Sequence, residues 1–323
     1  MRIISYLNTS NLSNLEADSG YVFQKTLLNE LAILGHEVYL IGPPKMSGLP
    51  SSITPIFLNF PDNKYGVRLG LEWEKLIKEL SKIEPCDVIL NNQSELTIAL
   101  KTACFEAWNK KIPLAIYFHY ISIEKRQTGQ ILFDPSHNLF GLSQLFWNRQ
   151  LESAEYSDAN IIGSNYGKKL FHKAFKAESK YSKFTIIPPP VQRFNKFKKE
   201  NKLKNKKQLT LLYNHRLYDH YGGVEIFKLL QELHKEIPFK LIITDPTGKR
   251  SLVRERFDKS VCTIRDFAEN LNFTEIKHFD TQETYYKAIR NIDIGIGHLR
   301  PGALWSMAIA DIMSLGKPVI GYK

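Results

Sequence analysis

The chain has 323 residues, of which 43% are hydrophobic, 24% charged and 12% aromatic, with 18 glycines and 15 prolines. This apolar share excludes intrinsic disorder, and the modest glycine and proline contents exclude fibrous and low-complexity classes. At about 150 residues a domain, the length predicts two domains, each large enough to bury its own core. The formal net charge is +11, and eight basic residues against one acidic residue lie between Arg193 and Lys207.

Targeting and cysteine signals are weak. Three widely spaced cysteines, without CxxC or Cys/His spacing, predict reduced thiols rather than a disulfide framework or a metal site. The apolar core of MRIISYLNTS is too short for a signal peptide, and no stretch approaches the ~18 apolar residues of a membrane span. We therefore expect a cytoplasmic protein, with peripheral association at the inner membrane face as one option for the basic segment.

In chain order, short apolar runs alternate with amphipathic stretches. In the first block we expect strands at 2–7, 37–41, 55–60, 87–91, 113–119, 160–163 and 184–188. The helices expected between them span 20–34, 69–83, 96–108, 140–156 and 166–174. After the basic segment, strands are expected at 209–213, 239–244, 275–279, 292–296 and 318–322. The helices of this second block are expected at 224–234, 264–271, 281–289 and 303–315.

This alternation predicts an α/β fold of two doubly wound, Rossmann-like domains with parallel sheets. We expect an N-terminal domain at 1–192, a basic linker at 193–208 and a shorter C-terminal domain at 209–323. Ligands of such sheets bind beyond the carboxyl ends of the strands, so the loops that follow strands are the candidate sites.

Four of these loops carry suitable chemistry. The first ends in Asp18, Gly20 and Tyr21 at a helix start, where either an anion or an ordinary N-cap is expected. His119 ends the buried-looking strand PLAIYFH and is placed to bind a ligand hydroxyl. Arg216 stands before a Gly-Gly helix start, as a clamp for a phosphate or as a partner of a nearby acid.

The fourth loop, HLRPGALWS, places Pro-Gly and small residues at an expected helix amino end, which suits a diphosphate. No Ser-His-Asp, HExxH, P-loop or paired-carboxylate pattern is present. By themselves, the four loops predict an anionic, nucleotide-containing ligand and do not name a reaction.

Four segments together resemble the retaining glycosyltransferases of family 4. These are SGYVFQKTLLNELAILGHEVYLIGP, DANIIGSNYGKKLF…KFTIIPPPV, NHRLYDHYGG and IDIGIGHLRPGALWSMAIADIMSLGKPVIGY. The resemblance implies the GT-B architecture, a nucleoside-diphosphate sugar donor (UDP- or GDP-sugar) and retention at the anomeric carbon, with no metal required and no further cofactor. Members of that family continue past "GKPVI" to a closing helix. Because this chain stops at Lys323, we expect either a truncated chain or a missing closing helix.

The resemblance also assigns roles to residues. Arg216 falls on the diphosphate-binding arginine and His119 on the histidine that approaches the donor sugar, so both are candidate catalytic residues. Asp311 falls on the second carboxylate of a glutamate pair, expected near the ribose. Tyr221 replaces the family's lysine and Ala303 its first glutamate. The residues expected to contact the donor are Gly20, Tyr21, Gly222, Gly302, Ala303, Leu304, Trp305, Ser306 and Asp311.

The acceptor stays open at this point. A cell-surface saccharide or lipid-linked glycan is the first option, with Asp18, Lys125 and Arg126 on the acceptor side. Hydroxymethylated bases of phage DNA are a second option, because Lys125, Arg126 and the segment Arg193 to Lys207 suit a phosphate backbone. The aromatic residues for a flipped base would be Phe133, Phe140, Phe146 and Trp147. A third option is a non-catalytic protein that binds a nucleotide sugar or nucleic acid.

Overall fold

A computed structural model provides the fold. It describes residues 1–7, 9, 12, 15–61, 64–92, 94–121, 123–125, 131–133, 142–175, 184–191, 208–217, 221–244, 260–279, 281–298 and 304–321. The chain divides into two compact units. The first comprises Met1–Pro190 and Pro301–Trp305, and the second comprises Val191–Arg300 and Ser306–Lys323. A short segment from late in the chain therefore belongs to the first unit, where the sequence had suggested a continuous second block.

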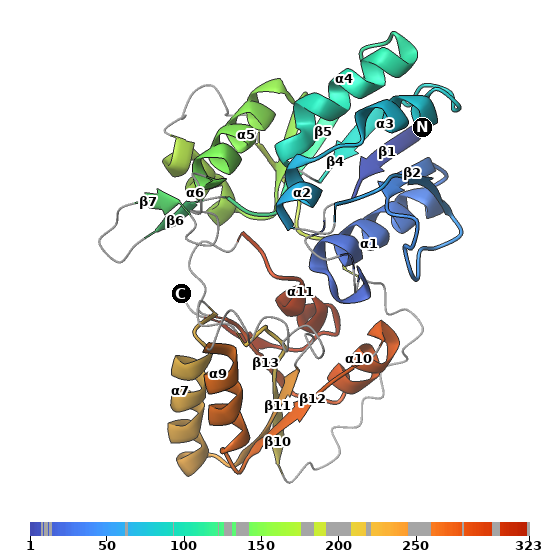
Figure 1. The fold of residues 1–323 in the computed structure, drawn as a ribbon. Helices are drawn as coiled ribbons and strands as arrows, with labels where there is room; N and C mark the ends of the chain where they lie inside the picture. The colour runs from blue at the N-terminus through green and yellow to red at the C-terminus, as the bar shows by residue number, and fades with distance from the viewer. Residues whose placement is uncertain are drawn as a thin grey trace. The chain divides into compact units, whose positions relative to one another are not determined.

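The first unit alternates strands and helices (Figure 1). Its strands are β1 (Arg2–Tyr6), β2 (Glu37–Gly42), β3 (Ile53–Phe57), β4 (Val88–Asn91), β5 (Leu114–Phe118), β6 (Ile123–Lys125), β7 (Ile131–Phe133), β8 (Ala159–Ile162) and β9 (Phe184–Ile186). Its helices are α1 (Ser19–Ile33), α2 (Lys64–Leu69), α3 (Trp73–Leu80), α4 (Thr97–Trp108), α5 (Leu142–Tyr156) and α6 (Asn165–Phe175). Two short 3₁₀ turns, η1 (Leu15–Ala17) and η2 (Ser94–Leu96), complete it.

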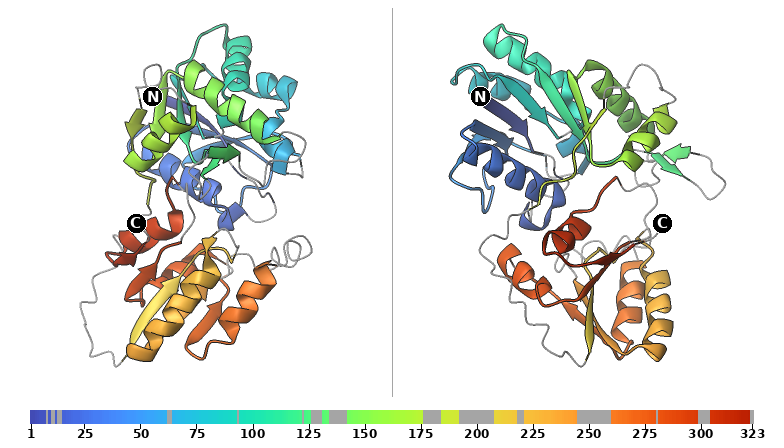
Figure 2. Two further views of the ribbon diagram at one scale, coloured as in Figure 1. Left: turned by 90° about the vertical axis from the view of Figure 1, so that its left-hand side faces the viewer. Right: turned by 180° about the vertical axis from the view of Figure 1, so that it is seen from behind.

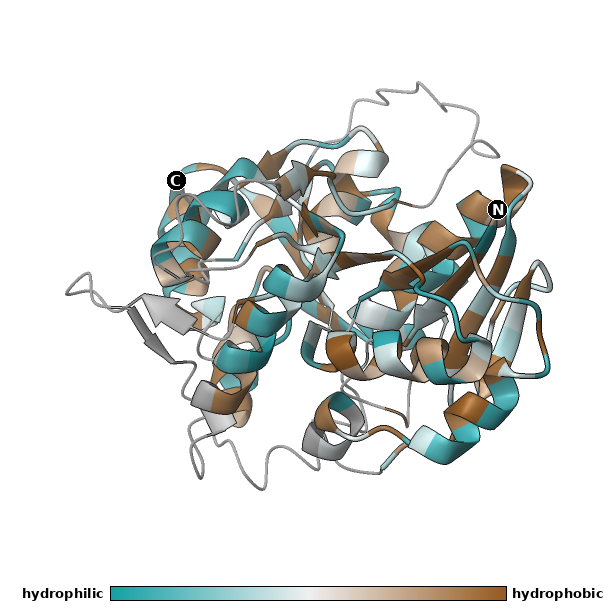
Figure 3. Cartoon of the chain, turned by 90° about the horizontal axis from the view of Figure 1, so that it is seen from above, coloured by the Kyte–Doolittle hydropathy of each residue, from teal (hydrophilic) through white to brown (hydrophobic). Residues whose placement is uncertain are grey.

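Seven of these strands form one parallel sheet in the order β3-β2-β1-β4-β5-β8-β9, while β6 and β7 pair antiparallel. Strand β2 shows why the sheet is covered on both faces. Its Val38 and Leu40 pack with α1, whereas Tyr39 and Ile41 pack with the cluster that includes α3 and α4. Parallel strands are buried on both faces, so they form nearly continuous apolar runs (Figure 3).

The second unit has a five-stranded parallel sheet in the order β12-β11-β10-β13-β14. Its strands are β10 (Leu209–Tyr213), β11 (Phe239–Thr244), β12 (Thr274–Lys277), β13 (Ile294–Ile296) and β14 (Val319–Ile320). Helices α7 (Gly223–Glu236) and α9 (Ser260–Glu269) pack on one face, and α10 (Gln282–Ile289) and α11 (Met307–Ser314) pack on the other (Figures 1 and 2). Both parallel sheets confirm the predicted doubly wound α/β class.

Two helices differ from the expected ranges for local reasons. The helix expected at 69–83 is shorter, since α3 spans only Trp73–Leu80, and a separate helix, α2, ends at Leu69 with the Gly70 N–H bonded to the Gly66 carbonyl. The helix expected at 303–315 begins at Met307, because the Ser306 hydroxyl caps it by accepting from the Ile309 N–H at 3.4 Å.

Candidate functional site

Each sheet reverses its strand order at one point, and ligands of doubly wound sheets bind at such a point. In the second unit the reversal lies between β10 and β13, so the loops carrying Arg216 and His298 leave neighbouring strands. In the first unit it lies between β1 and β4.

In the second unit, the amino end of α7 follows Arg216 along the chain. Gly222 precedes α7 with φ +68, a left-handed conformation that favours glycine, and it has no side chain to cap the helix. The first intrahelical bond runs from the Ile226 N–H to the Gly222 carbonyl, so the first-turn amides before Ile226 have no intrahelical acceptor. A half-buried Arg216 thus precedes the partial positive charge of a 14-residue helix.

Three aromatic rings lie at the same edge. The ring centroids of His215 and His298 are 4.8 Å apart, and those of Tyr221 and His298 are 5.3 Å apart. The Nε2 atom of His215 lies 3.1 Å from the Ile296 carbonyl oxygen. Burial, followed by the neighbouring His298, lowers the pKa of His215 to about 3, so this imidazole is neutral at pH 7 and donates Nε2–H to that carbonyl.

The predicted ribose ligand Asp311 lies inside the second unit. Its carboxylate accepts from the hydroxyl of Tyr286 at 3.2 Å and of Tyr285 at 3.4 Å. The amide of Asn214 donates in turn to the Tyr285 oxygen at 2.7 Å. Burial raises the pKa of Asp311 to about 7, although the two tyrosine hydrogen bonds oppose the shift. In this arrangement Asp311 organises two tyrosines and is 7% exposed.

The segment before α11 contributes to the first unit. Leu304 is buried, and its carbonyl accepts from the Ser164 hydroxyl at 3.0 Å. The Trp305 ring centroid lies 5.2 Å from that of His119 and 5.4 Å from that of Phe23. Leu304 and Trp305 thus contact the first unit, while Ser306 begins the part that returns to the second unit. The sequence predicted that both residues lie in the first turn of the helix, but they precede α11 and pack in the first unit instead.

His119 sits at the carboxyl end of β5 among aromatic side chains. Its ring centroid lies 4.5 Å from that of Phe23 and 5.1 Å from that of Tyr117, and the ring also contacts Trp305. Its Nε2 atom lies 3.1 Å from the side-chain oxygen of Asn92. The Nε1–H of Trp305 is buried and has no hydrogen-bond partner among the described residues. The sequence had singled out His119 but not Asn92, although Asn92 follows a buried strand at the reversal point.

The amino end of α1 is occupied by its own cap. The Asp18 carboxylate accepts from the backbone N–H groups of Gly20 and Tyr21 at 3.0 and 3.2 Å. Asp18 is 3% exposed, and the Tyr21 hydroxyl donates to the Ser47 carbonyl at 2.7 Å. Of the two interpretations open from the sequence, the structure has the ordinary N-cap, since these amides already serve an internal carboxylate.

Several predicted residues lie outside the described part of the chain. Arg126, Gly302 and Ala303 are among them, as is nearly all of the basic linker. Lys125 ends β6, and its side chain is not described. Phe140 is also outside, and for Phe133 only the backbone of β7 is described.

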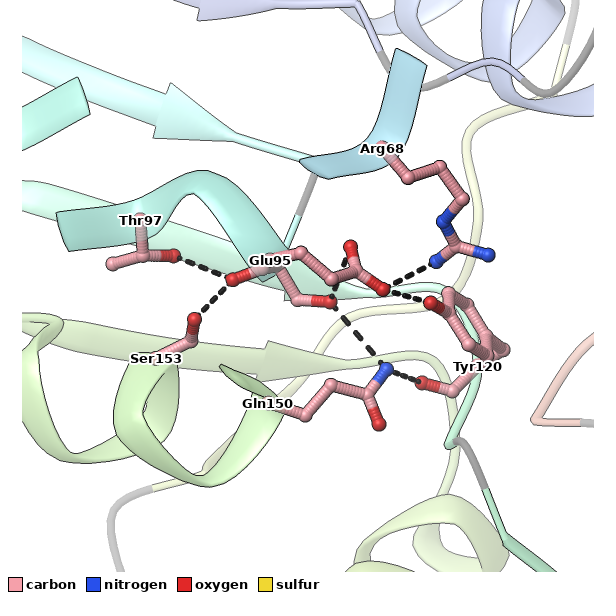
Figure 4. A network of polar contacts seen from close by, with 7 residues as sticks. Arg68, Glu95, Thr97, Tyr120, Gln150 and Ser153 are labelled. Atoms are coloured by element: carbon pink, nitrogen blue, oxygen red, sulfur yellow. Dashed lines mark hydrogen bonds and ion pairs between the residues drawn. The ribbon is translucent and has the colours of Figure 1, made fainter. Parts of the chain in front are cut away.

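A buried polar network beside His119 escaped the sequence-based prediction (Figure 4). Glu95 accepts from the Arg68 guanidinium at 2.5 Å, from the Tyr120 hydroxyl, and from the Ser94 hydroxyl at 3.2 Å. The Arg68 guanidinium carbon lies 4.0 Å from the centre of the Tyr120 ring and 4.9 Å from that of Phe146. A charged pair this deep forms only through contacts between α2, η2 and β5-adjacent residues, which no local sequence pattern reveals.

None of the helices in the ranges given above is long and apolar enough to cross a membrane. Within those same ranges, no group of three His, Cys, Asp or Glu side chains is arranged to hold a metal ion.

Neither a protein-family model nor a curated protein matches the sequence. Solved structures match the fold. Sucrose-phosphate synthase from Thermosynechococcus elongatus gives a TM-score of 0.63 at 12% identity, over 99% of this chain and 81% of that one. WaaG, a glycosyltransferase involved in lipopolysaccharide biosynthesis, gives 0.61 at 12% identity, over 99% and 80%. Arabidopsis thaliana UGT89C1, complexed with UDP-L-rhamnose, gives 0.54 at 16% identity, over 99% and 79%.

At these identities the similarity establishes the fold. The chain has the GT-B glycosyltransferase fold of two Rossmann-like α/β units, as the sequence predicted.

Proposed function

We propose that this protein is a glycosyltransferase that moves a sugar from a nucleoside-diphosphate sugar to an acceptor hydroxyl. The observation that carries the proposal is the amino end of α7, which receives no side-chain cap from Gly222 and which follows Arg216 along the chain at the strand reversal of the second unit. An arginine fork and free helix amides are the groups that bind a diphosphate.

The chemistry follows from these groups. When the bond between the sugar and the diphosphate breaks, negative charge grows on the leaving oxygen. Arg216 and the first-turn amides of α7 would stabilise that charge, and prearranged dipoles of this kind lower a barrier without reorganising. His119, in the first unit, is the candidate for contact with a sugar hydroxyl.

The resemblance of the sequence to family 4 supports transfer with retention, from a UDP- or GDP-sugar donor. It also supports a saccharide or lipid-linked glycan as the acceptor, at the cytoplasmic membrane face. Two of the structurally similar proteins support this direction, since one acts in lipopolysaccharide biosynthesis and another was solved with a UDP-sugar. The anomeric configuration of the product, read by NMR, tests retention.

No described residue favours the alternatives over this proposal. Phe146 is fully buried and packs against Arg68, so it is not available to stack on a flipped DNA base. Donor binding without transfer or hydrolysis would point instead to a non-catalytic binding protein.

The test is calorimetric titration with UDP-, GDP-, ADP- and dTDP-sugars. We expect one nucleotide to bind, and Arg216→Ala to weaken it by about 10- to 100-fold, as for the loss of a charge-assisted hydrogen bond. Lys228→Ala, an exposed cation on the same helix α7, is the matched control and should leave the affinity unchanged. Equal affinities for Arg216→Ala and the native protein would contradict the assigned diphosphate site.

A further inference from the structure

A chain of buried hydrogen bonds in the first unit ends at His119. It runs from β1 through Ser5 to Asn92, which follows β4, and then to His119, which follows β5. We propose that Asn92 is a positioning residue that holds His119 as the Nε2–H tautomer, so that Nδ1 accepts a hydrogen bond from a substrate hydroxyl. That this hydroxyl belongs to a sugar rests on the proposed function, whereas the tautomer of His119 does not depend on it.

The direction of the chain is set at Ser5. Its hydroxyl oxygen lies 2.7 Å from the Leu90 carbonyl, which can only accept, so the single hydroxyl proton points there. The Ser5 oxygen can therefore only accept from its other neighbours. Ser5 is fully buried in β1, opposite Leu90 in the parallel register, so water does not offer an alternative acceptor.

Two side-chain amides approach this oxygen. The Gln24 amide nitrogen lies 2.6 Å from the Tyr6 carbonyl and 3.1 Å from the Ser5 oxygen, and both must receive its protons. The Asn92 amide lies 3.3 Å from the same oxygen. If Asn92 were flipped, its carbonyl would face an oxygen with no proton to give. Asn92 must therefore turn its NH₂ to Ser5 and its carbonyl to His119.

This orientation decides the protonation of His119. The Asn92 carbonyl oxygen is 3.1 Å from Nε2, so Nε2 must carry a proton. Burial, and then the charge of Arg68, lowers the pKa of His119 to about 3, so the ring is neutral and carries that one proton only. Nδ1 is left with a lone pair, and it makes no hydrogen bond to any described residue.

A lone pair at Nδ1 selects what the ring can bind. It accepts from a hydroxyl and repels a phosphate or carboxylate oxygen, which brings no proton. Of the three aromatic rings around His119, those of Phe23 and Tyr117 are buried, so the half-buried ring of Trp305 is the one exposed enough to meet the apolar face of a carbohydrate. Asn92 acts on the substrate only through His119.

The tautomer is measured directly by ¹⁵N–¹H correlation spectra of protein labelled at its histidines, with His119→Gln to assign the signal. We expect a protonated Nε2 and an unprotonated Nδ1 from pH 5 to 8. Asn92→Ala should remove this preference, and Asn92→Asp should make His119 take up a second proton at higher pH. Asn91→Ala is the matched control, since Asn91 is a buried neighbour whose amide serves Thr97.

An Nδ1–H tautomer, a charged ring at pH 7, or equal effects of Asn91→Ala and Asn92→Ala would overturn the inference. The second readout compares the donor selected by the screen with its free nucleoside diphosphate, UDP-glucose and UDP being the first pair. Asn92→Ala should lower the affinity for the sugar nucleotide about fivefold or more and leave the affinity for the free nucleoside diphosphate unchanged. Equal effects on both ligands would overturn the positioning role. Failure of both ligands to bind the native protein would refute the proposed function, with the spectra still deciding the tautomer.

Discussion

Removing the charge of Glu95 should destabilise the first unit strongly. The Glu95 side chain is fully buried, its Arg68 partner is 8% exposed, and their closest atoms are 2.5 Å apart. Glu95→Gln keeps the shape but leaves a buried guanidinium without its counter-ion. Breaking a buried pair in this way costs about 3–5 kcal/mol.

The matched control is the same substitution in an exposed pair. Glu152 contacts Arg149 at 3.1 Å on α5, and the two side chains are 40% and 45% exposed. Pairs of this kind contribute about 0.5 kcal/mol, because solvent screens them and two long side chains must be ordered. The structure therefore predicts that Glu95→Gln lowers the free energy of unfolding several-fold more than Glu152→Gln, although the two changes are chemically identical.

Tryptophan fluorescence during urea unfolding is the suitable assay, because it reports on one unit only. The four tryptophans of the chain all belong to the first unit, namely Trp73, Trp108, Trp147 and Trp305. With a slope of about 2–3 kcal/mol per molar, typical of a domain this size, Glu95→Gln should lower the urea midpoint by roughly 1–2 M. Glu152→Gln should shift it by about 0.2 M.

A double variant separates the lost attraction from the stranded charge. If the stranded guanidinium dominates, adding Arg68→Met to Glu95→Gln should cost less than the two single changes added together, by about 1 kcal/mol or more. The reasoning is refuted if Glu95→Gln moves the midpoint no further than Glu152→Gln does, or if the effects of the two changes simply add.

Two further predictions concern a glycine and a carboxyl group. A Cβ atom at Gly163 would lie 2.9 Å from the Trp305 ring and 2.9 Å from the Tyr117 hydroxyl. Gly163→Ala should therefore cost about 1–3 kcal/mol and shift the tryptophan emission, unlike Gly321→Ala, whose Cβ meets open space. The pKa of Asp311 is raised to about 7 in the folded state, so the folded state holds this proton more tightly than the unfolded state does. The contribution of this proton to the free energy of unfolding is therefore fully present below about pH 4 and is lost as the pH rises through 7. Asp311→Asn should abolish this slope, of at most about 1.4 kcal/mol per pH unit, in hydrogen exchange of α10 and α11; an unchanged slope would contradict the assignment.

The strands and the fold class were predictable because a parallel strand buried on both faces leaves an apolar run that any window detects. Arg216 and His119 could be named as candidates for the same reason, since each stands within three residues of the end of such a run. Asn92 and Glu95 were missed because their roles depend on partners 87 and 27 residues away, Ser5 and Arg68.

Trp305 shows the limit from the other side. The apolar residues around Trp305 predict the first turn of a helix. The helix instead begins after Ser306, whose hydroxyl caps it, and serine is too common a residue to mark that start in the sequence. Nothing local indicates that the indole packs beside Phe23 and His119, because that contact depends on residues 282 and 186 positions earlier.

The place of Leu304 and Trp305 in the first unit also matters for how the protein is made. On the ribosome, residues up to 190 emerge long before residue 304, yet Leu304 supplies part of the apolar core that contains Ile162 and Phe171. The parts of the nascent first unit beside Gly163 and Gly167 therefore stay uncovered until residues 304 and 305 have been synthesised, and until then they are open to misfolding or to chaperone binding. For the same reason, a fragment cut at residue 190 should form the sheet but leave that part of the core open, and a synthetic peptide carrying residues 301–305 offers a way to complete it.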